Sequence, residues 1–177
     1  IFVRSGTYLE NIDITKTISL IGENKRDTII YGGEGYDTVV HIKAEYVSLT
    51  GFTVRGSHTD YYEAGLDVDF CDECNVTDNI ISDNYVGVGL YGGSRNTFCR
   101  NTIVNSYLGV SLSPNLQYAT LKDNVLANNT YDLVFAEVHS SNDIDASNLV
   151  DGKPLYFLTN QKNILISPAT FPEIGFL

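Results

Sequence analysis

The sequence contains no methionine, only three cysteines and no long apolar run in 177 residues. Three cysteines are an odd number and too few for a disulfide scaffold, so they do not indicate a redox compartment by themselves. Apolar runs such as 17–22 and 155–158 have the size of a strand and fall far short of the roughly 20 residues of a membrane-spanning helix. We therefore expect no membrane insertion in this segment.

Basic residues are scarce. The chain has 11 Lys and Arg against 22 Asp and Glu, which gives a formal net charge of −11 at pH 7. A surface of this sign repels nucleic-acid phosphates and anionic lipid headgroups. Nucleic acids and membrane surfaces are therefore not expected as partners.

An initiator Met and a signal peptide are also missing. The chain opens at Ile1-Phe2-Val3, in a stretch that already has the pattern of a strand. We expect a processed or partial piece of a longer protein. With 43% apolar residues, the 177 residues are expected to bury the core of a single domain, 1–177.

The chain does contain an internal repeat, which is the most informative feature of the sequence. The segment 78–90 aligns position for position with 100–112, and a third copy lies at 123–135. The starting points differ by 22 and then 23 residues. An earlier copy begins at Thr50 and carries extra residues from His58 to Glu63, which we expect to form a loop at one corner.

Each copy holds short β-branched segments separated by turn residues, without the 3.6-residue spacing of a helical repeat. One coil of this kind cannot bury its own apolar side chains, but coils stacked about 4.8 Å apart pair every strand with its neighbours. The sequence predicts an all-β, single-stranded right-handed parallel β-helix with roughly seven to eight coils of about 22 residues. Residues 1–44 are predicted as irregular first coils, 45–140 as regular coils with an inserted loop near 57–63, and 141–177 as the last coils.

Two sets of residues recur at corners of the predicted coils. Asn79, Asn101 and Asn124 precede a strand, where their amides are expected to bond one another along the stack and to tolerate a left-handed backbone. Gly87 and Gly109 recur at a second corner. Either a positive φ or a close approach between coils would require glycine there.

Four acids, Asp67, Asp69, Asp72 and Glu73, lie close together in the sequence. Strand alternation points Asp67 and Asp69 outward, as glycoside hydrolysis by two carboxylates would need. The next two coils, however, offer no second acid at these positions. We interpret the four acids as solvated surface charge, with a calcium site as the alternative. No catalytic residue is assigned.

The cysteines and two Asn-X-Thr sequons are the remaining candidate sites. Two residues separate Cys71 from Cys74, and Cys99 follows about one coil later. A zinc site made of three thiolates would lack its fourth ligand, so a corner disulfide or buried thiols are favoured. The sequons begin at Asn75 and Asn128, and they carry meaning only in an exported protein.

The coil pattern N-x-I-x-x-N-x-x-G-I-x-L resembles the repeat of pectate-lyase-like and NosD-like β-helix proteins, and residues 1–33 resemble their first coils. This resemblance implies the fold but not an activity, because the scaffold hosts lyases, hydrolases, esterases, adhesins and inert surface proteins. The NosD-like name implies a link to copper-site maturation. Against copper binding, the chain has no Met and only three widely spaced histidines, His41, His58 and His139.

The segment 148–157 is similar to one in archaeal surface proteins, particularly those of methanogens. This similarity, the sequons and the acidity favour an extracellular or cell-surface structural module, such as an envelope layer, sheath or fibre subunit, that associates with itself or with neighbouring subunits. The alternative is a carbohydrate-binding module or a polysaccharide lyase or hydrolase, in which outward acids and tyrosines line a groove. Corner tyrosines suit either sugar stacking or packing between molecules, and we favour packing. They are Tyr61, Tyr62, Tyr85, Tyr91 and Tyr107.

Overall fold

The computed structural model describes residues 1–33, 37–57, 63–135 and 138–177 of the chain. Every regular element in these residues is a β-strand. The described part therefore contains no helix of the length and apolar character needed to cross a membrane.

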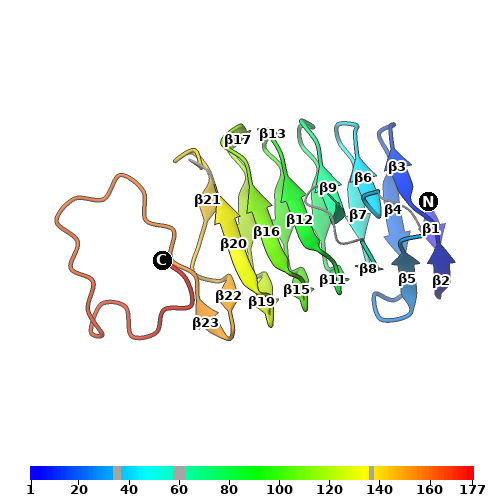
Figure 1. Ribbon diagram of the computed structural model, residues 1–177. Coiled ribbons are helices and arrows are strands. Elements are labelled where there is room, and N and C mark those ends of the chain that lie inside the picture. Colours follow the sequence, from blue (N-terminus) through cyan, green and yellow to red (C-terminus); the bar gives the residue numbers. More distant parts are fainter. Residues whose placement is uncertain (34–36, 58–62, 136–137) are drawn as a thin grey trace.

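The strands form three sheets that run along one axis, as Figure 1 shows, and they pair in parallel except for β22 with β23. The first sheet contains β1 (Phe2–Val3), β4 (Ser19–Gly22), β7 (Ser48–Thr50), β10 (Asn75–Thr77), β14 (Thr97–Cys99), β18 (Thr120–Lys122) and β21 (Asp143–Ile144). The second contains β2 (Gly6–Leu9), β5 (Thr28–Tyr31), β8 (Thr53–Arg55), β11 (Ile80–Ser82), β15 (Thr102–Val104), β19 (Val125–Ala127), β22 (Leu149–Val150) and β23 (Lys153–Pro154). The third contains β3 (Ile12–Ile14), β6 (Val40–Ile42), β9 (Ala64–Val68), β12 (Val86–Leu90), β16 (Leu108–Leu112) and β20 (Tyr131–Phe135). A small fourth sheet pairs β13 (Gly93–Ser94) with β17 (Leu116–Gln117).

The chain visits the three sheets in turn, which confirms the predicted all-β parallel β-helix. The third sheet has six strands in the described residues, so there are six complete turns, and β21 with β22 begins a seventh. The expected seven to eight coils were slightly too many. After the antiparallel hairpin of β22 and β23, the chain makes a wide excursion instead of another turn, and it returns so that Leu155 bridges Phe176 (Figure 1).

Inward side chains stack in columns from coil to coil. Ile81 lies in register with Ile103, and Ile103 with Leu126, as the repeat predicts, and all three are buried. Leu90 and Leu112 likewise stack and are buried. Phe135, the third member of that column, is 37% exposed because it lies in the last strand of its sheet.

The corner asparagines form a continuous ladder. The Asn101 Oδ1 accepts hydrogen bonds from the backbone N and the Nδ2 of Asn79, at 3.0 and 3.2 Å, and its own Nδ2 donates to the carbonyl of Val76 at 2.9 Å. Asn124 repeats the arrangement below Asn101, and Asn148 extends it by one coil.

The left-handed residue at this corner is the one before each ladder asparagine. Asp78, Arg100 and Asp123 have φ of 58°, 55° and 56°, whereas the asparagines themselves do not have positive φ. Gly87 and Gly109 do not lie at a second corner as predicted, because they belong to β12 and β16, and neither has positive φ. A Cβ at Gly87 would lie 2.5 Å from the carbonyl oxygen of Gly109, so close approach between coils is what requires glycine.

Candidate functional site on the third sheet

The outward face of the third sheet gathers five ionisable side chains from three successive coils. Asp13 of β3 lies in register with His41 of β6, and His41 with Asp67 of β9. Lys43 and Asp69 lie two residues beyond His41 and Asp67, so strand alternation turns them to the same side. We call Asp13, His41, Lys43, Asp67 and Asp69 the third-sheet cluster.

His41 links the two exposed acids of this cluster. Its Nδ1 lies 3.8 Å from Asp13 Oδ1, and its Nε2 lies 3.6 Å from Asp69 Oδ2. Lys43 Nζ contacts the same Asp13 oxygen at 2.9 Å. The side chains of Asp13, Lys43 and Asp69 are 58%, 38% and 41% exposed, so both charge signs are open to a ligand from solvent.

Asp67 differs from its neighbours because it is buried, with only 4% of its surface exposed. Its Oδ2 accepts a hydrogen bond from Thr38 Oγ1 at 2.9 Å, while Oδ1 has no hydrogen-bond partner in the described part of the chain. Burial raises the pKa of Asp67 to about 7. The hydrogen bond from Thr38 lowers this pKa, and the charge of Asp69 raises it by a smaller amount. A buried carboxyl with a shifted pKa beside exposed charges is typical of a functional site.

Aromatic side chains border the cluster on the side of the next coil. A side chain at Gly89 would collide with Asp67 Oδ1 and with the Tyr91 ring, so glycine makes room for both. Burial, together with the charges of Asp67 and Asp69, raises the pKa of Tyr91 to about 12. Phe70, directly after Asp69, is 66% exposed. An exposed aromatic residue therefore follows the last acid of the cluster in the chain, and its ring lies close to Gly92 of the next coil.

The four acids that the sequence favoured as solvated surface charge, with a calcium site as the alternative, make separate contacts. Asp67 and Asp69 belong to the third-sheet cluster, Asp72 Oδ1 accepts from the backbone N of Ser94 at 2.7 Å, and Glu73 pairs with Arg95 at 2.9 Å. Within residues 1–33, 37–57, 63–135 and 138–177, no three His, Cys, Asp or Glu side chains are grouped so as to hold a metal ion.

Cys71, Cys74 and Cys99 are buried free thiols, which is one of the two alternatives that the sequence left open. The Cys71 Sγ donates to the carbonyl of Asp69 at 3.0 Å, and the Cys74 Sγ to that of Ala44 at 3.3 Å. Burial raises the pKa of all three thiols, that of Cys71 to about 11. Such thiols are poor nucleophiles and poor metal ligands.

The two sequons lie at different kinds of position. Asn75 is exposed on β10, and Thr77 lies two residues on, facing the same side. Asn128 lies at a corner with φ of 56°, and its backbone N donates to Asp151 Oδ1 at 3.1 Å. Glycosylation at either asparagine stays a prediction.

Three corner tyrosines form a column of their own. The rings of Tyr85 and Tyr107 stack at 4.9 Å between centroids, and Tyr131 meets Tyr107 edge-on at 5.4 Å. The stacked faces contact each other along the axis, so these rings pack within the chain, whereas packing between molecules stays a prediction. The predicted loop tyrosines, Tyr61 and Tyr62, and His58 lie outside the described residues, as does most of the inserted loop near 57–63.

The family model described as "Periplasmic copper-binding protein (NosD)" matches residues 1–171. The chain belongs to the NosD family. The NosD description agrees in a general sense with the expected location outside the cytoplasm, whereas a cell-surface position and the archaeal similarity of 148–157 stay predictions. No curated protein matches the chain.

Among solved structures, this NosD-family chain is similar to a pectin methylesterase mutant in complex with a hexasaccharide. The identity is 18% and the TM-score is 0.45. The match covers 83% of this chain and 49% of the other, so the chain spans about half the length of that protein. At this identity, the likeness concerns the fold alone.

The described residues do not fit the copper that the NosD description names. Copper sites use thiolate, thioether or imidazole ligands. The chain has no methionine, and its three thiols are buried. Burial raises the pKa of each thiol, and those of Cys71 and Cys74 are also hydrogen-bonded. His41 lies between Asp13 and Asp69, and His139 Nδ1 contacts Ser141 Oγ at 2.8 Å. No group of three ligands forms within the described residues, so we infer no function through copper.

Sequence reasoning found Asp67 and Asp69 but missed the other members of the cluster. Asp13 and His41 are 28 residues apart, and His41 and Asp67 are 26 apart, so the 22-residue period does not align them. The alternation in 12–14 and 40–42, where a polar residue stands between two apolar ones, is the signal that could have found Asp13 and His41.

Proposed function

We propose that this NosD-family chain is a carbohydrate-binding β-helix module that works outside the cytoplasm and contacts sugars through the third-sheet cluster and Phe70. The observation that carries the proposal is the gathering of exposed charges of both signs on one sheet face, with the exposed Phe70 directly after Asp69 in the chain. Carboxylates accept hydrogen bonds from sugar hydroxyls, and Lys and His donate to them. An aromatic face packs against the apolar face of a pyranose ring.

Binding without cleavage fits the cluster better than glycoside hydrolysis. A hydrolase needs two carboxyl groups that both reach the scissile bond, about 5 to 10 Å apart. Asp67 is 4% exposed and faces Thr38 and Tyr91, so only Asp69 and Asp13 are open to a ligand. Both exposed acids already contact His41. This arrangement supports recognition and leaves no free acid–base pair.

The test is calorimetric titration of the folded protein with soluble oligosaccharides, using an oligogalacturonide and a cello-oligosaccharide as probes. Phe70→Ala is expected to weaken binding by about tenfold, because a ring contact contributes roughly 0.5 to 1.5 kcal/mol beyond its buried area. Tyr118→Ala is the matched control, since Tyr118 is 59% exposed at another corner. Absence of binding to both probes, or equal weakening by the two variants, would contradict the proposal.

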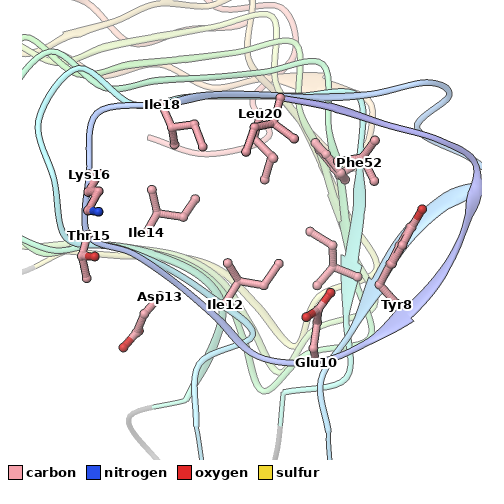
Figure 2. Close-up of a pocket in the computed structure, with 13 residues that line it drawn as sticks. Tyr8, Glu10, Ile12, Asp13, Ile14, Thr15, Lys16, Ile18, Leu20 and Phe52 are labelled. Atoms are coloured by element: carbon pink, nitrogen blue, oxygen red, sulfur yellow. The ribbon is translucent and has the colours of Figure 1, made fainter.

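A second candidate function is the structural role favoured by the sequence, self-association of the β-helix. Its specific observation is a hollow of about 350 Å³ in the first coil. Ile12, Ile14, Ile18 and Leu20 line this hollow, and Figure 2 shows their side chains around it.

Sedimentation velocity over a range of concentrations tests this second candidate. Ile12→Lys is expected to abolish association, because Ile12 lines the hollow, whereas Ile21→Lys on the outward face of β4 is expected to leave it unchanged. A wild-type protein that stays monomeric at every concentration argues against the structural role.

A further inference from the structure

The first sheet carries two columns of side chains in register, most of them small and polar. In the first column, β7, β10, β14 and β18 contribute one residue each in register, and the second column lies two residues further along the same strands. The first column is Ser48, Asn75, Thr97 and Thr120, and the second is Thr50, Thr77, Cys99 and Lys122. We call these eight residues the first-sheet face.

The first-sheet face is a rigid plane. Between its two columns, Leu49, Val76, Phe98 and Leu121 point inward and are buried. Parallel strands lie about 4.8 Å apart, and residues i and i+2 of one strand about 6.6 Å apart, so the hydroxyls repeat on a fixed grid. Six of the eight side chains are partly or fully exposed hydroxyls or amides.

The cations that border this face are each paired across coils. Arg95 contacts Glu73 at 2.9 Å, and Arg100 contacts Asp78 at 2.8 Å. Lys122, the one charged member of the face, contacts Asp143 at 2.7 Å. The chain has a net charge of −11. This face nevertheless offers hydroxyl groups, and the cations at it are neutralised by neighbouring acids. The complementary partner is uncharged.

We propose that the first-sheet face binds the flat surface of an ordered, uncharged polysaccharide, in which chains lie side by side. Both surfaces are rigid and periodic, so many weak hydrogen bonds form at once with little loss of conformational freedom. A single flexible chain gains less, because the eight residues of the columns include no aromatic ring on which a sugar could stack. The inference rests on the proposed function for the ligand class but uses a different face from the third-sheet cluster.

The sequon at Asn75 competes with this use of the face. Asn75 lies between Ser48 and Thr97 in the first column. An N-linked glycan there would project from the middle of the face and cover it. Unglycosylated protein is therefore the form to test.

The experiment measures depletion of the full chain from solution by microcrystalline cellulose and by chitin. Thr97→Lys, which places an unpaired charge in the face, is expected to reduce the retained fraction by about tenfold. Thr102→Lys is the matched control, because Thr102 is a partly exposed, outward threonine of the next strand in the same coil, on the second sheet. Thr50→Lys replaces Thr97→Lys if the latter lowers the melting temperature.

The outcomes separate this inference from the proposed function. If cellulose or chitin retains Phe70→Ala but no longer retains Thr97→Lys, the result supports two faces that bind carbohydrate independently. Equal retention of Thr97→Lys and Thr102→Lys overturns the inference, as does a wild-type protein that neither solid retains. Loss of soluble oligosaccharide binding by Phe70→Ala then still reports separately on the third-sheet cluster.

Discussion

At the scale of single residues, Asp67 gives the clearest pH dependence. Its carboxyl is buried in the folded chain, and its pKa is raised from an ordinary 3.8 to about 7. The folded state therefore binds the proton more tightly than the unfolded state does. The resulting stabilisation is fully present below about pH 4 and is lost as the pH rises towards 7.

Asp67→Asn removes this titration, so the variant is expected to gain stability relative to wild type between about pH 5 and pH 8. The relative gain is bounded at about 4 kcal/mol, from roughly 1.4 kcal/mol per pKa unit. Urea unfolding of both proteins across this range measures it. Asp69→Asn, on the exposed side of the cluster, is the control. Parallel pH profiles for wild type and Asp67→Asn would rule out a buried, proton-binding Asp67.

At the scale of elements, the asparagine ladder fixes the corner between the first and second sheets. Asn101→Ala leaves the backbone N of Asn79 and the carbonyl of Val76 without their side-chain partners inside the stack. The free energy of unfolding is expected to fall by about 2 to 4 kcal/mol, since each buried polar group left unpaired costs about 1 to 3 kcal/mol.

Chemical denaturation of Asn101→Ala measures this loss, with Asn115→Ala as the control on an exposed asparagine. A loss no larger than that of the control would show that the ladder does not stabilise the stack. The repeat indicated the position of the ladder, because the three asparagines share one register. It did not indicate which corner residue has positive φ, because Asp78 and Arg100 carry no glycine-like signal.

At the scale of the whole molecule, the three thiols report on global opening. Cys71 and Cys74 lie inside the stack and Cys99 is 8% exposed, so none is expected to react with a thiol reagent in the folded state. All three are expected to react with an aromatic disulfide reagent in denaturant without a reductant. The absorbance of the aromatic thiolate that the reagent releases counts the reacted thiols. Fewer than three reactive thiols in the unfolded chain would mean that a disulfide forms in the natural protein.

The sequence by itself determined the architecture. Copies offset by 22 and 23 residues place apolar side chains such as Ile81 and Ile103 in one column, and no fold other than stacked coils buries them together. The tertiary structure alone decided the candidate site. Asp13, His41 and Asp67 come from coils of unequal length, so only the strand register brings them side by side. The burial of Asp67 likewise depends on Thr38 and Tyr91, from the coils on either side, which no local pattern specifies.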